Sequence, residues 1–212
     1  MNLIIISGPS GSGKSNLATR ISNEFKDLNI IKTDSYYRDN LIVKMLSLYF
    51  KDIYDRIISI KRKQLIDTLN SISNKEEFIY SYNYNFRTRK STKKEINIKS
   101  SQNMSRIVIL EGIFAHRLIK NFKNQIIMKI LCIEHKNLCF KRRVRRDLRE
   151  RGRKRKEVEE RFQRSWEIFH NQSFNFKKDN EVIYLNKKDE EQYNNIINRI
   201  ESLNLKTKKN VD

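Results

Sequence analysis

Leu3-Ile4-Ile5-Ile6-Ser7-Gly8-Pro9-Ser10-Gly11-Ser12-Gly13-Lys14-Ser15 is the stretch of this chain that predicts its fold. The stretch opens with an apolar run typical of a strand buried on both faces, and the run ends at a glycine and a proline. From Lys14 onward the apolar spacing changes to four residues, as on one face of a helix, with side chains at Leu17, Ile21 and Phe25. We therefore expect a strand, a glycine-rich loop and a helix in direct succession.

The loop between that strand and that helix fits the pattern G-x-x-x-x-G-K-[ST]. Because glycines lack a Cβ, the backbone N–H groups of such a loop can curl around a phosphate, and the positive end of the helix points at the same anion. The Lys14 ammonium can reach the β- and γ-phosphates, and the Ser15 hydroxyl can bind Mg²⁺. We predict a site for a nucleoside triphosphate, ATP or GTP, formed by Gly8, Ser10, Gly11, Ser12, Gly13, Lys14 and Ser15.

Further strands alternate with helices along the chain. The apolar patterns predict strands at 29–32, 106–110, 126–133 and 181–185, and helices at 136–150, at 157–170 and from Tyr193 to Leu203. Such alternation predicts an α/β fold, in which a mostly parallel five-stranded sheet lies between two layers of helices as in P-loop NTPases.

We expect a single domain over residues 1–205, followed by a polar tail at 206–212. Residues 35–105 show mixed helical spacing at 41–69 and a tyrosine-rich strand and loop at 77–86, and little other pattern. They are expected to form a small insertion on the acceptor-substrate side of the sheet.

The chain is strongly basic, with 45 Lys and Arg against 25 Asp and Glu and a formal net charge of +20. Such an excess can neutralise the phosphates of a nucleic acid. The alternative explanation of the excess is an AT-rich genome, which favours Lys, Asn and Ile, and these residues are abundant throughout the chain. The excess is concentrated at 141–161, where a small polyphosphate substrate explains it equally well. A nucleic-acid partner remains an alternative to a small-molecule substrate.

The composition excludes several classes of protein. No apolar run is long enough to span a membrane, and the N-terminus has no signal-peptide pattern. Cys132 and Cys139 lack the spacing of a metal or redox site. We expect a reduced, cytoplasmic protein without a membrane partner, and the sequence leaves a homo-oligomer open.

Two acidic residues follow predicted strands. Asp34 comes after the strand at 29–32, and Glu111 after the strand at 106–110. In an open parallel sheet, ligands bind beyond the carboxyl ends of the strands, where either carboxylate could hold Mg²⁺ or take a proton from an attacking hydroxyl. Each could instead be a helix cap. Tyr37 follows Asp34 closely and offers an aromatic face to a sugar-like acceptor, or simply packs in the core.

The segment 141–153 is too basic for a core helix. Arg143 and Arg146 share one helix face, and Asp147 could orient Arg143. Arg151 and Arg153 flank a glycine. We expect residues 141–161 to form a helical, arginine-rich lid that stabilises phosphoryl charge and excludes water. A solvated charged helix and a nucleic-acid groove are the alternatives.

These motifs, in this order, resemble those of the uridine kinase family, which includes phosphoribulokinase-like enzymes. The resemblance extends from residue 1 to about residue 200 and is strongest at 8–15, 33–38, 109–115 and 142–153. A weaker match is Tyr82-Asn83-Tyr84-Asn85-Phe86, which is similar to a substrate loop of the family.

The resemblance implies phosphorylation of a nucleoside 5′-hydroxyl, of uridine or cytidine, with ATP or GTP as donor. It implies that Asp34 is the general base and that Ser15 and Glu111 organise Mg²⁺. Arg146 and Arg151 would hold phosphate together with Lys14. The residues implied to contact the acceptor are Tyr84, Arg143 and Arg153, beside Tyr37. Asp189 falls where the family contacts adenine.

The acceptor half departs from the family pattern. The His-Pro-Asp segment that holds the ribose has no match, and Asp55 is the nearest acid. Asn85 stands where Asp is usual, Arg89 where a base-contacting His is expected, and Arg161 near an expected Gln. The added positive charge favours a phosphorylated or acidic acceptor such as a sugar phosphate. A non-catalytic regulator that has lost its acceptor is a further alternative.

Overall fold

The computed structural model describes residues 1–25, 28–50, 53–97 and 107–209. Its central sheet has five strands in the order β2-β5-β1-β6-β7, and all neighbouring strands run parallel. The strands are β1 (Asn2–Ser7), β2 (Asn29–Lys32), β5 (Ile107–Glu111), β6 (Ile126–Ile133) and β7 (Val182–Asn186). The predicted parallel α/β fold is confirmed, although Arg106, expected to begin one strand, lies outside the described residues.

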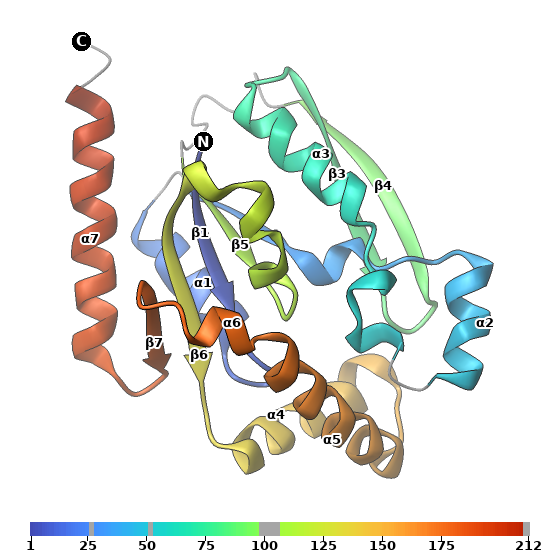
Figure 1. Ribbon diagram of the computed structural model, residues 1–212. Helices are drawn as coiled ribbons and strands as arrows, with labels where there is room; N and C mark the ends of the chain where they lie inside the picture. The colour runs from blue at the N-terminus through green and yellow to red at the C-terminus, as the bar shows by residue number, and fades with distance from the viewer. Residues whose placement is uncertain (26–27, 51–52, 98–106, 210–212) are drawn as a thin grey trace.

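Helices cover both faces of this sheet (Figure 1). Alternate residues of β1 point to opposite faces, which explains why the whole strand is apolar. Ile4 and Ile6 pack against α1 (Lys14–Glu24) and α7. Leu3 and Ile5 belong to a second core. The helices that contribute to this second core include α3 (Arg62–Ser73), the 3-10 helix η4 (Ala115–Asn121), α5 (Arg155–Gln172) and α6 (Phe174–Lys177).

The closing helix is longer than the apolar spacing indicates. α7 spans Glu190–Lys209, so it continues into the segment expected to be a polar tail at 206–212. Lysine is a good helix former, which allows the helix to extend beyond its last apolar contact. Residues 210–212 of the expected tail lie outside the described part of the chain.

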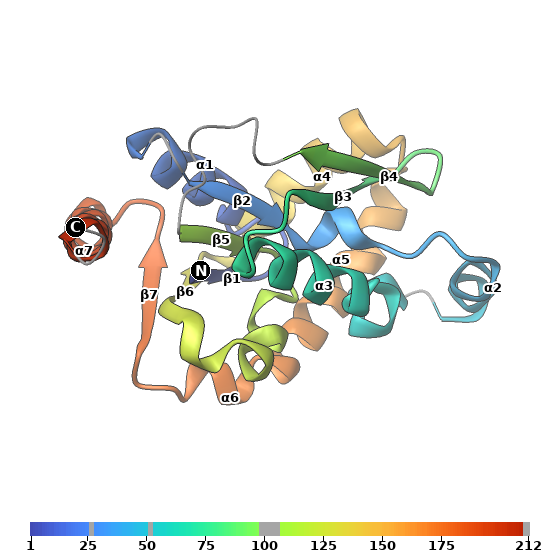
Figure 2. The ribbon, with the colours of Figure 1, turned by 90° about the horizontal axis from the view of Figure 1, so that it is seen from above.

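A lobe between β2 and β5 stands beside the sheet. It consists of η1 (Thr33–Tyr36), α2 (Leu41–Tyr49), the short turns η2 (Ile53–Asp55) and η3 (Ile57–Ser59), α3, and the antiparallel hairpin of β3 (Phe78–Asn85) and β4 (Lys90–Asn97). The helical spacing expected at 41–69 is divided between α2 and α3 rather than continuous. Figure 2 shows α2 at the opposite end of the molecule from α7. The last part of the expected insertion, 98–105, lies outside the described residues.

The arginine-rich segment forms a helical pair beyond the carboxyl ends of β1 and β6 (Figure 1). α4 spans Lys136–Arg151, and Gly152 ends it in the left-handed conformation with φ 63° before α5 begins. Both helices are longer than the expected 136–150 and 157–170. None of the helices in the described ranges is long and apolar enough to cross a membrane.

Candidate active site

The phosphate-binding loop lies between β1 and α1, as predicted from its flanking elements. Gly11 and Gly13 adopt left-handed φ angles of 88° and 98°. A Cβ on Gly11 would overlap the carbonyl oxygen of Cys139 in α4, so glycine is needed there for close approach as well as for conformation. The Lys14 ammonium is buried and donates to the carbonyl oxygen of Pro9 at 2.9 Å, within the loop itself.

The Ser15 side chain connects this loop to the end of β5. Its hydroxyl donates to Glu111 Oε1 at 2.9 Å, and Glu111 is 4% exposed. Burial raises the pKa of Glu111, the Lys14 charge opposes that rise, and the Asp34 charge adds to it. Asp34 and Glu111 are therefore electrostatic neighbours at adjacent strand ends, as the order β2-β5 requires.

The Asp34 carboxylate sits on the 3-10 turn η1, directly after β2. Its Oδ1 atom is buried and has no hydrogen-bond partner among the described residues. The turn packs closely on the neighbouring strand end, because a Cβ on Gly112 would overlap the Thr33 hydroxyl. Gly112 belongs to the family match at 109–115 but was given no role of its own from the sequence; in the structure it positions the turn that carries Asp34.

These oxygens suit a hard cation. Ser15 Oγ, Glu111 and the unpartnered Asp34 Oδ1 offer hydroxyl and carboxylate donors beside the phosphate loop. The described residues contain no cluster of three or more acidic, His or Cys side chains that could hold a metal alone. Mg²⁺ commonly binds through one or two protein oxygens, with phosphate oxygens and water completing the shell, so the residues present fit that ion.

Asp147 organises the arginines of α4 and the following turn. It is fully buried, and its carboxylate lies 2.8 Å from Arg153, 2.9 Å from Arg146, 3.5 Å from Arg151 and 3.8 Å from Arg143. Burial alone would raise the pKa of Asp147, but the four guanidiniums lower it, so the carboxylate stays ionised. The spacing of Asp147 suggested a partner for Arg143 alone, whereas the structure gives it all four.

The helical pair also contacts the phosphate-binding loop. Arg142 donates to the carbonyl oxygen of Gly11 at 3.2 Å, and Arg146 donates to Ser10 Oγ at 3.3 Å. Arg143 points to the inside of the pair, where it donates to Ser165 of α5. Arg142 and Arg146 are therefore next to the position that a bound phosphate would take.

A second pocket lies between the lobe and the helical pair. It brings together the predicted acceptor residues Tyr37, Tyr84, Arg143 and Arg153 with Arg151. Tyr54, Asp55, Phe86, Arg89 and Arg161 complete its lining. Sequence reasoning had marked Asp55, Arg89 and Arg161 only as departures from a pattern, since nothing in their local spacing showed that they face one pocket.

We call this second pocket the acceptor pocket, because it gathers the predicted acceptor residues. Aromatic rings form one of its walls. The ring centroids of Tyr37 and Tyr84 are 5.4 Å apart, and those of Tyr84 and Phe86 are 5.1 Å apart. The Arg151 guanidinium lies 3.7 Å above the Phe86 ring, which joins the aromatic wall to the arginines. The wall suits a flat or sugar-like ring.

A third hollow lies on the other side of the phosphate loop, toward β7 and α7. It includes Asp189, whose Oδ1 accepts a hydrogen bond from the backbone N–H of Gln192 at 3.0 Å and so caps α7. The other lining residues are Ser12, Gly13, Asn16, Leu17, Arg20, Cys132, Leu185, Asn186, Lys187 and Tyr193. This hollow adjoins the phosphate-binding loop at Ser12 and Gly13.

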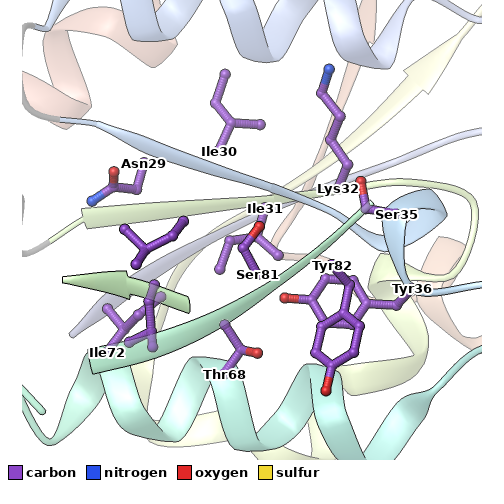
Figure 3. Close-up of a pocket in the computed structure, with 12 residues that line it drawn as sticks. Asn29, Ile30, Ile31, Lys32, Ser35, Tyr36, Thr68, Ile72, Ser81 and Tyr82 are labelled. Atoms are coloured by element: carbon purple, nitrogen blue, oxygen red, sulfur yellow. The ribbon is translucent and has the colours of Figure 1, made fainter. Parts of the chain in front are cut away.

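A separate cavity of about 270 Å³ lies behind the turn η1, away from these three sites. Figure 3 shows it between β2, β3 and α3, with Tyr36 and Tyr82 at one end and Ile72 at the other. Ser35 and Tyr36 line this cavity, whereas the next residue, Tyr37, lines the acceptor pocket. The turn that carries Asp34 thus separates two hollow spaces.

Comparison with known proteins agrees with this arrangement. The model of the "Phosphoribulokinase / Uridine kinase family" matches residues 3–184. A uridine kinase from Haemophilus ducreyi is 33% identical over 159 residues, which are 71% of this chain and 69% of that protein. A uridine kinase from Pectobacterium atrosepticum is 31% identical over 169 residues, or 77% and 76% of the two chains. The solved structure of a possible uridine kinase from Bacillus stearothermophilus has the same fold, with a TM-score of 0.57 at 12% identity, over 86% of this chain and 88% of that one.

Proposed function

Because the chain belongs to the phosphoribulokinase/uridine kinase family, we propose that it transfers the γ-phosphate of ATP to the 5′-hydroxyl of a nucleoside such as uridine or cytidine. The observation that carries the proposal is the position of Asp34 between two clusters. Its negative charge acts to raise the pKa of Glu111 beside the phosphate loop, and it acts in the same direction on the pKa of Tyr37 and Arg151 in the acceptor pocket. A carboxylate between donor and acceptor can take the proton of the attacking hydroxyl.

The donor half would hold the triphosphate through the loop N–H groups and Lys14. When the triphosphate binds, phosphate oxygens would replace the Pro9 carbonyl oxygen as the acceptor for the Lys14 ammonium. They would likewise replace Ser10 Oγ as the acceptor for Arg146. Arg151, whose guanidinium lies over the Phe86 ring and interacts with the charge of Asp34, would face the phosphoryl group in transfer. These fixed positive charges stabilise the negative charge that spreads over the transferring group.

Ser15 and Glu111 would hold Mg²⁺ beside the phosphates. Bound there, the ion would neutralise charge on the β- and γ-phosphate oxygens. The two helices α4 and α5 cover the same space, so they keep water away from the donor while the acceptor hydroxyl is in place. Water would otherwise compete as the acceptor.

The direct test supplies the protein with Mg²⁺, ATP or GTP, and a panel of nucleosides, sugar phosphates and pantothenate, and identifies phosphorylated products by mass. Asp34→Asn should lower kcat by about 10²–10⁴-fold, because it removes the base, and leave the Kd for ATP nearly unchanged. Asp67→Asn, at an exposed position of α3, is the matched control and should keep full activity.

Each other outcome has a defined meaning. Retained turnover in Asp34→Asn would refute the base assignment. ATP binding without transfer to any member of the panel would refute the kinase proposal and favour a regulatory role. Salt-sensitive binding of RNA or DNA with no small-molecule product would favour the polynucleotide alternative.

A further inference from the structure

Two arginines on the lining of the acceptor pocket, Arg89 and Arg161, have no role in the mechanism proposed above. Arg89 lies in the turn of the β3–β4 hairpin, with a left-handed φ of 54°, and Arg161 lies on α5. Although they are 72 positions apart in sequence, both line the pocket that holds Tyr84 and Arg153. The hairpin and the helical pair thus meet at these two guanidiniums.

The positive charge of these two residues is balanced less well than that of the other three arginines on the lining, Arg143, Arg151 and Arg153. Arg143, Arg151 and Arg153 all share the buried carboxylate of Asp147. Arg161 pairs with Glu157 at 3.0 Å, but that carboxylate is 40% exposed and also lies 4.0 Å from Arg153. Across the ranges that the structure describes, no carboxylate lies within ion-pair distance of Arg89.

Burial lowers the pKa of Arg161, and the neighbouring charges of Arg153 and Arg89 add to that effect, while Glu157 and Asp55 oppose it. Asp55 is the one carboxylate on the lining, against five arginines. Such a group of guanidiniums is stabilised by an additional anion.

The carboxylates that neighbouring arginines share show the order in which these arginines follow one another along the pocket. The turn that carries Asp34 leads into Tyr37 on the pocket lining, where Arg151 and Arg153 share the carboxylate of Asp147. Arg153 and Arg161 in turn share the carboxylate of Glu157, at 4.0 Å and 3.0 Å, and Arg89 lines the same pocket. The pocket therefore extends from Asp34 past Arg151 and Arg153 to Arg89 and Arg161, so an acceptor whose hydroxyl meets Asp34 presents its far end to the last two.

We propose that the acceptor carries an anionic group, a carboxylate or a phosphate, at the end opposite its reactive hydroxyl, and that Arg89 and Arg161 bind that group. This inference rests on the kinase function proposed above and specifies its substrate class. The planar guanidinium forks suit carboxylate and phosphate oxygens, and the ring between the two ends packs on the wall of Tyr37, Tyr84 and Phe86. A neutral nucleoside fills the same space but leaves both guanidiniums without a counter-charge.

The test compares acceptors that differ only in the anion. Rates are measured with ATP and Mg²⁺ as the common donor. Uridine is compared with 5-carboxyuridine and with orotidine, and ribulose is compared with ribulose 5-phosphate. We expect kcat/KM to be at least tenfold higher for the charged member of one pair, mainly through KM. The pair that shows the preference distinguishes a carboxylate from a phosphate.

Variants then assign the preference to the two arginines. R89N, chosen because asparagine tolerates the left-handed conformation, and R161Q should each lower kcat/KM about tenfold more for the charged acceptor than for the neutral one. R89K and R161K, which keep the charge, should retain part of the preference. R145Q removes the same charge from an exposed position of α4 and should change neither rate.

The outcomes separate the inference from the function on which it rests. Transfer to uridine at a rate equal to or above that of every charged acceptor, unchanged in R89N and R161Q, would overturn the inference and leave the kinase function standing. Absence of transfer to any acceptor would overturn both. Thermal unfolding of each variant shows whether a lost rate comes from lost structure, and the lysine variants answer the question if a neutral variant fails to fold.

Discussion

The Ser15 hydroxyl donates to Glu111 Oε1 at 2.9 Å and so joins the phosphate-binding loop to the end of β5. We predict that Glu111→Gln, which keeps the shape of the side chain but removes its charge, lowers kcat at least tenfold and raises the Mg²⁺ concentration needed for half-maximal rate. The reason is that an amide oxygen is a weaker ligand for a hard cation than a carboxylate. A magnesium titration of the initial rate measures both effects. An unchanged magnesium requirement in this variant would contradict the role given to Glu111.

Removal of the charge on Asp147 should damage the helical pair. Asp147→Asn leaves four guanidiniums around a buried neutral group, so we expect a loss of about 3–5 kcal/mol in the free energy of unfolding. Urea unfolding measures it. Asp179→Asn is the control, because its partner Lys129 lies near the surface and such pairs contribute about 0–1 kcal/mol. Equal losses in the two variants would refute the organising role of Asp147.

His116 should make the stability of the protein fall with acid. The ring is buried against Ser7, with Nδ1 2.9 Å from the serine hydroxyl, and burial lowers its pKa to about 4. Because the unfolded chain binds a proton near pH 6.5 and the folded one near pH 4, unfolding takes up a proton between these values. The contribution of His116 is therefore complete above about pH 6.5 and declines by about 3 kcal/mol as the pH falls to 4.

His116→Asn should flatten that part of the pH dependence, since asparagine does not titrate. Unfolding free energies at several pH values, taken as the difference between the native protein and the variant, remove the contribution of other acids. A difference that stays constant from pH 7 to pH 4 would show that His116 does not titrate as its burial indicates.

Gly112→Ala should displace the turn that carries Asp34, because a Cβ at this position overlaps the Thr33 side chain. We expect a fall in both the melting temperature and kcat. Gly152→Ala is the matched control: its φ of 63° is also left-handed, but a Cβ there meets nothing within 4 Å. It should cost only the backbone strain, about 1 kcal/mol, and keep kcat. Parallel melting curves and rates distinguish the clash from the strain.

The sheet and the phosphate loop could be predicted from the sequence because their signals are local. The apolar run of β1 and the glycines at fixed spacing before Lys14 define a strand, a loop and a helix without reference to the rest of the chain. β4 gave no such signal. Its sequence Lys-Ser-Thr-Lys-Lys-Glu-Ile-Asn is almost entirely exposed and lacks an apolar face, and it forms a strand only because it pairs with β3.

The acceptor pocket could be predicted only in part, since its members come from distant segments. Tyr84 and Arg153 were singled out through a family resemblance, whereas Arg89 and Arg161 differ from that resemblance and carry no local pattern. What unites them is the meeting of the hairpin with the helical pair, where Arg87 donates to two carbonyl oxygens of α4, a long-range property that spacing along the chain does not encode. Gly112 was missed for the same reason, because its neighbour Thr33 belongs to another strand end.

The turn η1 forms a partition between the space where catalysis is proposed and the cavity shown in Figure 3. Ser35 and Tyr36 border this empty volume, and Tyr36 also packs on Tyr82 of β3 with the ring centroids 5.1 Å apart, so a change of residue size on β3 or α3 can shift the turn. Sequence drift in this lobe would then reposition the Asp34 carboxylate along with the pocket. In evolutionary terms, a lineage that retunes its choice of acceptor here would change its turnover at the same time.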